Sequence, residues 1–209
     1  MLLVGLTGSI GTGKSTTAAM FKDYNFGVYN ADDTVHYIYE NDMNVIDQIE
    51  EIFPGTKENN KVNRKLLRDI LNEKPEKFKE LESVVHPVTR QYQITYIKKL
   101  IEEQKFGCVL DIPLLFETGG DQYVDVSIVV IASENKQRER VVGERQIPIE
   151  VFNILKKQQM PDHDKLKKAN FIISTEKSIK STKTEVENTV AQLKLIEPKA
   201  WNEFYGKMK

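Results

Sequence analysis

Short apolar runs separated by longer polar segments form the pattern of this chain. Five runs are continuous rather than alternating, which is typical of parallel strands buried on both faces. Helix-forming segments fall between them, so the pattern predicts an α/β fold with a parallel sheet flanked by helices. The predicted strands are residues 2–6, 27–29, 106–112, 126–131 and 171–173.

Two stretches between these strands are too long for simple crossovers. Residues 42–104 are polar and contain at least three helical patterns, including 63–71 and 75–85. We interpret this stretch as a helical insertion that receives a second substrate. Residues 133–168, dense in Arg, Lys and Gln, are interpreted either as a mobile lid over bound nucleotide or as a solvated helical hairpin.

The C-terminal part, residues 179–209, is expected to form a helix that packs on the core. Val186, Val190 and Leu193 share one face of this amphipathic stretch. The last residues, 198–209, contain Trp201 and no pattern that assigns them a role.

One motif carries the clearest chemistry. Residues 8–15 match G-x-x-x-x-G-K-[ST], between the first predicted strand and a helix-forming run. Strand, glycine loop and helix are the context that identifies a phosphate-binding P-loop. Glycines let backbone N–H groups curl around phosphate oxygens, and the helix N-terminus favours negative charge. The predicted ATP-binding residues are Gly11, Thr12, Gly13, Lys14, Ser15 and Thr16.

Composition limits the partners and the compartment that we expect for this protein. The 209 residues carry 30 Lys and Arg against 31 Asp and Glu, a formal net charge of -1, so a general nucleic-acid or membrane surface is not expected. The single Cys108 lies in an apolar run and is expected to be a buried thiol in a reducing compartment. No apolar run reaches the roughly 20 residues of a membrane span. A cytoplasmic protein, monomeric or a small homo-oligomer, is expected.

Carboxylates follow two of the predicted strands, where ligands of open α/β sheets gather. Asp32 is the candidate base for an incoming hydroxyl, and the alternative makes it, or Asp33, the N-cap of the next helix. Asp111 closes the third strand. Its carboxylate is expected to lie just outside the direct ligands of a Mg²⁺ ion that Ser15 holds. The guanine-reading and water-orienting motifs of hydrolytic switches are absent from the sequence, which favours a small-molecule kinase.

Several elements together resemble the dephospho-coenzyme A kinase family, over about residues 1–178. These are the P-loop, Ala31-Asp32 followed by His36, the His86-Pro87 pair, and Asp111-Ile112-Pro113-Leu114-Leu115-Phe116-Glu117. The similarity continues through Gln137, Arg140, Gln159-Met160-Pro161, Lys165 and Ala169-Asn170-Phe171.

This resemblance implies the last step of coenzyme A biosynthesis, in which ATP phosphorylates the 3′-hydroxyl of the dephospho-CoA ribose. It implies a nucleotide core (1–41, 105–132 and 169–209), a CoA-binding insertion (42–104) and a lid (133–168). It makes Asp32, Lys14 and Arg140 catalytic and assigns ATP contacts to the P-loop and Arg140. It places His36, Arg64, His86 and Glu117 with Asp32 on the acceptor side. Taken alone, His36 and His86 are equally well explained as structural groups, and Arg64 as part of a solvated helix face.

The chain departs from the family pattern in three places. Asn30 stands where the family usually has Asp, and Asn170 and Ser174 replace a usual Asp and Asn. In the lid, Glu144 occupies the place of a second arginine, and Arg145 follows one residue later. On an ideal helix that shift rotates Arg145 by about 100°, so it can contribute only if the helix ends or bends near Gly143.

We therefore expect an ATP:dephospho-CoA 3′-phosphotransferase with Mg²⁺ as cofactor. The alternatives are another small-molecule or nucleotide kinase with the same core, and a P-loop ATPase switch that turns over ATP without an acceptor.

Overall fold

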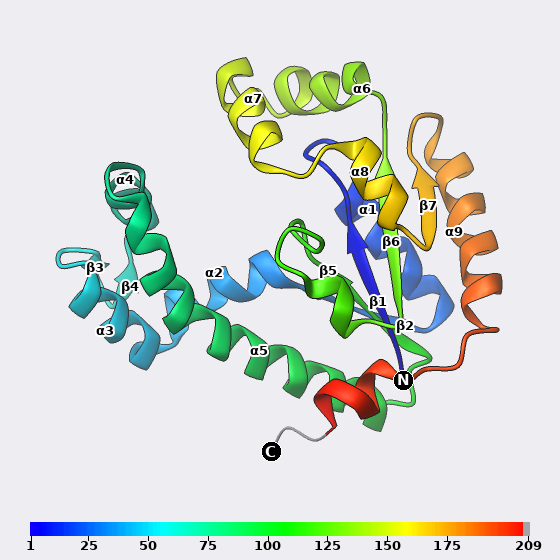
Figure 1. Cartoon of the computed structure of the whole chain (residues 1–209), viewed down its shortest axis with the longest axis horizontal. Helices are drawn as coiled ribbons and strands as arrows, with labels where there is room; N and C mark the ends of the chain where they lie inside the picture. Colours follow the sequence, from blue (N-terminus) through cyan, green and yellow to red (C-terminus); the bar gives the residue numbers. More distant parts are fainter. Residues whose placement is uncertain (207–209) are drawn as a thin grey trace. The chain divides into compact units, whose positions relative to one another are not determined.

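The computed structural model describes residues 1–206, which divide into two units (Figure 1). The first, the core unit, comprises residues 1–29 and the chain from Lys99 onward. The second, the inserted unit, comprises Asn30–Lys98. One boundary falls at the end of a strand, and the other falls within a long helix.

A five-stranded sheet in the order β2-β5-β1-β6-β7 forms the centre of the core unit. The pairs β1·β5, β1·β6 and β6·β7 are parallel. All five predicted strands are confirmed, each within a residue or two at its ends. They are β1 (Leu2–Thr7), β2 (Phe26–Asn30), β5 (Gly107–Asp111), β6 (Val126–Ile131) and β7 (Phe171–Ser174).

Apolar side chains cover both faces of this sheet, which explains why its strands are continuous apolar runs. Alternate residues of β1 and β6 pack with α1 (Lys14–Met20) and α9 (Ile179–Leu193). Val129, between two of these β6 residues, instead packs with Leu115 and Phe116. In α9, Val186, Val190 and Leu193 are buried in the core, so the predicted docking of this helix is confirmed.

The predicted lid stretch is helical throughout most of its length (Figure 1). Pro148 and Pro161 lie in the short connections that precede the helices at residues 149–158 and 162–168, and Asn170 lies in the connection before β7. Its elements are α6 (Glu134–Arg138), the π-helical η4 (Glu139–Glu144), α7 (Ile149–Gln158) and α8 (Asp162–Lys168).

The inserted unit has its own apolar core, formed by side chains of α2, α3, α4 and the first half of α5. It also contains a two-stranded antiparallel hairpin that the helical interpretation of residues 42–104 missed. These strands have two residues each, too few for an alternating pattern. The elements are α2 (Ala31–Asn41), α3 (Met43–Ile52), β3 (Lys57–Glu58), β4 (Lys61–Val62), α4 (Arg64–Glu73), η2 (Pro75–Lys77) and α5 (Phe78–Glu102).

Helix α5 is longer than the sequence pattern predicts, because it continues through Pro87. Proline has no N–H and therefore removes one backbone hydrogen bond from a helix interior. Ile94, Ile97 and Leu100 are nearly fully buried beyond it, so tertiary packing maintains the helix.

The C-terminal residues, for which the sequence suggested no role, pack on the core unit as far as Tyr205. The rings of Trp201 and Tyr205 stack 5.9 Å apart within η5 (Trp201–Tyr205). The carboxylate of Asp125 accepts hydrogen bonds from the backbone N–H groups of Lys199 and Ala200, 2.6 and 2.7 Å. The remaining short helices of the core unit are η1 (Phe21–Tyr24) and η3 (Gly120–Tyr123).

Cys108 lies in β5 and is completely buried, as predicted. Burial raises the pKa of its thiol to about 12, so the group is protonated and unreactive at neutral pH. Within residues 1–206, no helix combines the length and the apolar character that crossing a membrane requires.

Candidate functional site

The P-loop joins the carboxyl end of β1 to the first turn of α1. Gly11 and Gly13 have φ angles of 80° and 83°, a left-handed conformation that favours glycine. A Cβ on Gly11 would lie 2.7 Å from the carbonyl oxygen of Gln137, so the lid backbone approaches the loop directly. Gly13 is the N-cap of α1 and has no side chain to occupy the first-turn N–H groups. Those donors suit an anion.

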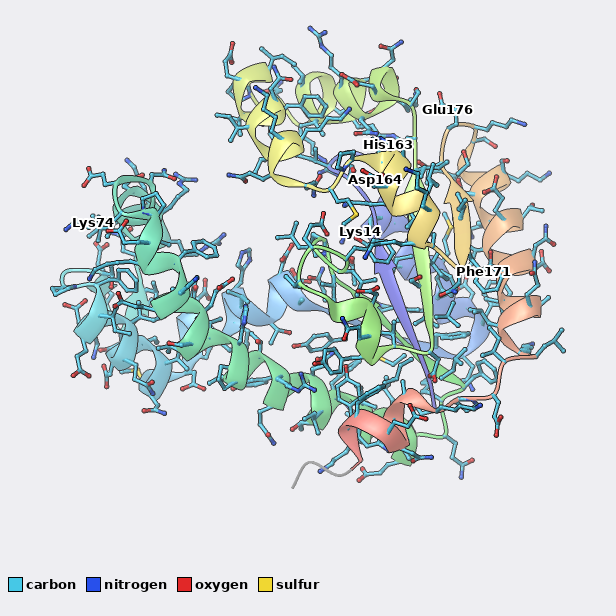
Figure 2. The ribbon with its side chains drawn as sticks, viewed as in Figure 1. Lys14, Lys74, His163, Asp164, Phe171 and Glu176 are labelled. Carbon is cyan, nitrogen blue, oxygen red and sulfur yellow. The ribbon has the colours of Figure 1, made fainter. Side chains whose placement is uncertain are left out.

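Lys14 begins α1 and lies at the carboxyl ends of the strands (Figure 2). Its Nζ contacts Oδ1 of Asp111, the last residue of β5, in an ion pair whose carboxylate is 1% exposed. Leu6 of β1 is in register with Asp111, which explains how two residues so distant in sequence meet. The predicted place of Asp111 at the strand end is confirmed.

The hydroxyl groups of the loop point to different tasks. Ser15 and Thr16 are exposed in the first turn of α1. Thr12 is buried, and both its N–H and its hydroxyl donate to the carbonyl oxygen of Ser9, at 3.2 and 2.8 Å. Thr12 therefore stabilises the loop internally, and Ser15 and Thr16 remain open to a ligand.

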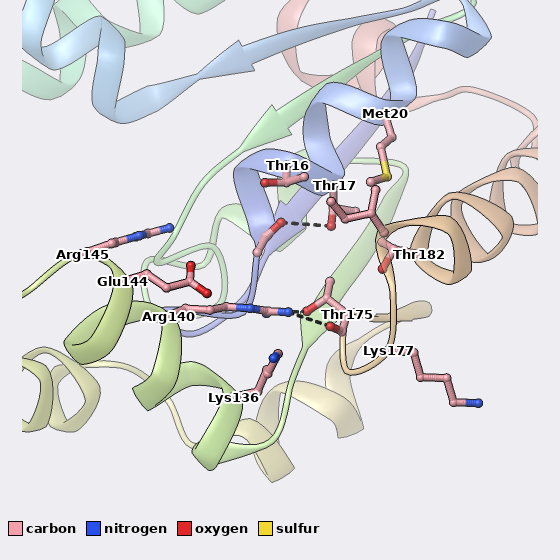
Figure 3. A pocket seen from close by; sticks show the side chains of 12 residues that line it. Thr16, Thr17, Met20, Lys136, Arg140, Glu144, Arg145, Thr175, Lys177 and Thr182 are labelled. Atoms are coloured by element: carbon pink, nitrogen blue, oxygen red, sulfur yellow. Dashed lines mark hydrogen bonds between the residues drawn. The ribbon is translucent and has the colours of Figure 1, made fainter.

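Arg140, the predicted lid arginine, lies against the P-loop (Figure 3). Its guanidinium donates to the carbonyl oxygen of Gly11 at 3.1 Å, and to the hydroxyl and carbonyl oxygens of Thr175 at 2.8 and 2.7 Å. The Thr175 hydroxyl in turn donates to the carbonyl oxygen of Thr12 at 2.6 Å. Sequence reasoning missed Thr175, although it directly follows β7, at the edge where ligands of such sheets gather.

A cavity of about 330 Å³ lies beside these residues, between the start of α1, the η4 segment of the lid and the loop after β7 (Figure 3). Lys136, Arg140, Arg145 and Lys177 line it, together with the carboxylate of Glu144. An excess of cationic groups next to open helix N–H donors suits a polyphosphate.

The lid helix accommodates the displaced second arginine by changing its geometry. Residues Glu139–Glu144 form a π-helical turn, in which the N–H of Arg145 donates to the carbonyl oxygen of Arg140 at 3.2 Å. A π turn pairs residues five apart, so the wider turn compensates for the extra residue. The regular helix ends here, which meets the condition for a contribution from Arg145, and Arg145 lines the same cavity as Arg140.

Ser133, the first residue of the lid stretch, is hydrogen-bonded to the loop after β7. Glu176 accepts hydrogen bonds from the N–H and the hydroxyl of Ser133, at 2.6 and 2.9 Å. These donors, with the positive charges of Arg140 and Lys136, hold the pKa of the Glu176 carboxyl below its usual range.

Asn170 has a structural task at the start of β7. Its side-chain oxygen accepts from the N–H and hydroxyl of Ser127 in β6, at 2.8 and 3.0 Å. An amide oxygen supplies the acceptor that a carboxylate would offer, so the departure at this position leaves the strand pairing supported.

In the inserted unit, Asp32 is exposed in the first turn of α2. The N-cap of this helix is Asn30, whose side-chain oxygen accepts from the N–H of Asp33 at 3.1 Å. The alternative in which Asp32 or Asp33 caps the helix is therefore wrong, because α2 already begins at Ala31. Asn30 performs the capping, and the Asp32 carboxylate has no such task.

The other predicted acceptor residues lie on three helices of the same unit. His36 is half-buried in α2, whereas Arg64, the first residue of α4, is exposed. The side chain of His86 in α5 is 65% exposed, and its Nε2 lies 3.9 Å from a carboxylate oxygen of Glu82. Burial raises the pKa of the neighbouring Tyr39 phenol to about 12, and the charge of Arg64 opposes this shift. The role of His36, Arg64 and His86 in acceptor binding stays a prediction.

Glu117, also predicted on the acceptor side, contacts the lid. Its Oε1 accepts from the N–H of Met160 at 2.7 Å and lies 3.1 Å from Nζ of Lys165. His163 is exposed on α8 (Figure 2).

Comparison with known proteins identifies the family of this chain. The family model described as dephospho-CoA kinase matches residues 2–181. The dephospho-CoA kinase of Nitrobacter winogradskyi is 38% identical over 191 residues, covering 91% of this chain and 95% of that protein. That of Bartonella quintana is 40% identical over 193 residues, covering 92% and 98%. The structure of the dephospho-CoA kinase from Campylobacter jejuni superposes with a TM-score of 0.67 at 27% identity, covering 91% of this chain and 96% of that chain. The chain therefore belongs to the dephospho-CoA kinase family.

Proposed function

We propose that this protein transfers the γ-phosphoryl group of ATP to the 3′-hydroxyl of the dephospho-CoA ribose. Membership of the dephospho-CoA kinase family makes it the enzyme of the final step of coenzyme A biosynthesis. The observation that supports ATP as the phosphoryl donor is the P-loop, with open N–H donors at the start of α1 and Lys14 beside them. We place the reaction in the cytoplasm, in a monomer or small homo-oligomer without nucleic-acid or membrane partners.

On the donor side, the first-turn N–H groups of α1 and Lys14 hold the β- and γ-phosphates. ATP extends from these groups into the cavity beside Arg140 and Thr175. Arg140 and Arg145 place positive charge near the transferring group, where a fixed cation stabilises developing negative charge most effectively.

The residues of the loop fit the divalent cation that P-loop kinases use with ATP. Ser15 offers an exposed hydroxyl at the start of α1, and the Asp111 carboxylate lies behind it on Lys14. Mg²⁺ prefers such hard oxygen donors and keeps waters and phosphate oxygens as its other ligands. A metal held mainly by protein carboxylates is not expected, because residues 1–206 contain no group of three or more metal-ligating His, Cys, Asp or Glu side chains. When bound, Mg²⁺ neutralises charge on the β- and γ-phosphate oxygens.

On the acceptor side, Asp32 accepts the proton of the ribose 3′-hydroxyl as its oxygen attacks the γ-phosphorus. The new P–O bond forms as the bond to the leaving ADP oxygen breaks, and catalysis consists largely of holding the two groups in line. His36, Arg64 and His86 bind dephospho-CoA. The acceptor role of Glu117 stays a prediction, since its described contacts are with the lid.

An acceptor screen tests this function. Purified protein is incubated with ATP and Mg²⁺ and with dephospho-CoA, nucleoside monophosphates or no acceptor, and CoA and ADP are measured together. We expect ADP release that depends on dephospho-CoA and matches CoA formation. Turnover with a nucleoside monophosphate alone would indicate a different kinase, and ADP release without any acceptor would indicate an ATPase switch.

A further inference from the structure

Residues 159–162, which comprise the connection between α7 and α8 and the first residue of α8, contact the P-loop at two points. The side-chain oxygen Oε1 of Gln159 accepts a hydrogen bond from the N–H of Ile10 at 2.9 Å. The hydroxyl of Ser9 donates to Oδ1 of Asp162. The N–H of Ile10 is therefore directed to the lid, whereas the N–H groups of the first turn of α1 remain for phosphate.

Asp162 also connects this contact to the first lid helix. Its second oxygen accepts from Nε2 of Gln137 at 3.2 Å, and the same nitrogen donates to the carbonyl oxygen of Ala132 at 2.9 Å. Gln137 is fully buried. A buried amide with two acceptors at defined distances leaves Asp162 little freedom to move.

On its other side, the connection is held by Glu117 and Lys165. Oε1 of Glu117 accepts from the N–H of Met160 at 2.7 Å and lies 3.1 Å from Nζ of Lys165. Lys165 is 0% exposed, and within residues 1–206 neither its Nζ nor Oε2 of Glu117 has a hydrogen-bond partner. A fully buried ammonium group depends on its counter-charge, so each of these two side chains restricts the position of the other.

We propose that Gln159 and Asp162 are positioning residues for the P-loop, and that the buried Lys165–Glu117 pair holds their segment in place. Residues 159–162 thus set the shape of the ATP site through their contacts with residues 9 and 10 of the P-loop. This inference rests on the proposed function in one respect: the ligand whose affinity it controls is ATP rather than dephospho-CoA.

The first test replaces Gln159 by Met, which keeps the length of the side chain and removes the acceptor of the Ile10 N–H. We expect Kd and KM for ATP to rise about five- to tenfold, the effect of losing one partly buried hydrogen bond. KM for dephospho-CoA and the melting temperature stay near wild type. The matched control is Gln158→Met at the exposed neighbouring position, which leaves ATP affinity unchanged.

The second test is a double-mutant cycle on the buried pair. Lys165→Met leaves the Glu117 carboxylate without its cation, and we expect a loss of ATP affinity greater than tenfold together with lower thermal stability. Glu117→Gln in the same chain neutralises the site and keeps an oxygen for the N–H of Met160. The double variant is therefore expected to bind ATP within about threefold of wild type.

Equal ATP affinity of Gln159→Met and Gln158→Met would overturn the positioning role of Gln159. A single Glu117→Gln variant that raises KM for dephospho-CoA and leaves ATP affinity unchanged would assign Glu117 to the acceptor instead. ATP affinity is measured by calorimetry without an acceptor. A wild-type protein that fails to phosphorylate dephospho-CoA would thus refute the proposed function and leave the test of the P-loop contacts intact.

Discussion

The predicted donor residues and the predicted acceptor residues differ in how the protein holds them. In the core unit, Lys14 and Arg140 each contact partners from distant parts of the chain, and Arg140 makes three hydrogen bonds. In the inserted unit, Asp32 and Arg64 are exposed on first turns of helices, and His86 is exposed within α5. Lys14 and Arg140 are thus preorganised by the fold, whereas Asp32, Arg64 and His86 are exposed to solvent.

This difference has an energetic meaning. A group fixed by several hydrogen bonds loses little freedom when its ligand binds, and its electrostatic effect needs no reorganisation. An exposed side chain gains most of its ordering from the ligand itself. Substitutions on the donor side are therefore expected to disturb neighbouring residues, and those on the acceptor side to act on chemistry or acceptor binding alone.

The largest effect is expected for Asp32→Asn. Loss of the general base lowers kcat by about 10²- to 10⁴-fold. The Kd for ATP and the melting temperature stay near wild type, because the side chain is exposed and does not cap α2. Steady-state kinetics and calorimetry measure both. Asp33→Asn, one residue away in the same turn, is the control, and a comparable loss in that variant would remove Asp32 as the base.

A smaller effect is expected for Arg140→Met. The guanidinium donates charged hydrogen bonds to Gly11 and Thr175. A loss at the ATP site equal to one such bond, about 1.5–3 kcal/mol, lowers kcat/KM for ATP about 10- to 100-fold. Arg145→Met, which removes an exposed group at the same cavity, lowers it less than about threefold. The exposed Arg138→Met serves as the control. A larger effect at Arg145 than at Arg140 would reverse the order we assign to the two arginines.

Removal of the cap of α2 is expected to affect stability more than chemistry. Asn30→Ala deletes the acceptor for the N–H of Asp33 and lowers the free energy of unfolding by about 1 kcal/mol. Asn30→Asp restores the residue that the related family pattern has, keeps an acceptor oxygen and retains this stability. Urea unfolding of the three proteins checks the prediction. Equal stability of the Ala and Asp variants would show that the cap contributes nothing.

The smallest effect concerns pH. Since the folded-state pKa of Glu176 is lowered from 4.5, its carboxylate stabilises the fold above that value. The contribution is lost as the pH falls through the lower folded pKa. Melting temperatures of wild type and Glu176→Gln, measured from pH 7 to pH 3, are therefore expected to converge below about pH 4.5. The same substitution at the exposed Glu150 provides the baseline, and an equal convergence there would contradict the assignment.

The sequence pattern located the sheet and the P-loop with small errors, and it located the helix ends less well. Residues 2–6 are apolar without interruption because both faces of β1 are covered. In the P-loop, glycine, lysine and serine stand at fixed spacings because the loop must wrap around phosphate. The β3–β4 hairpin and the passage of α5 through Pro87 escaped prediction, because short strands and packing beyond a proline leave no local pattern.

What the sequence by itself determined is the α/β class, the ATP-binding loop and the family, because each is written in residues close together or in motifs of set spacing. The tertiary structure alone decided which groups meet: Arg140 with the carbonyl oxygen of Gly11, 129 positions away, and Gln159 with the N–H of Ile10, 149 positions away. It also decided that a π-helical turn brings Arg145 to the cavity of Arg140. Such pairings depend on how helices pack over the strand ends, and no local periodicity records that packing.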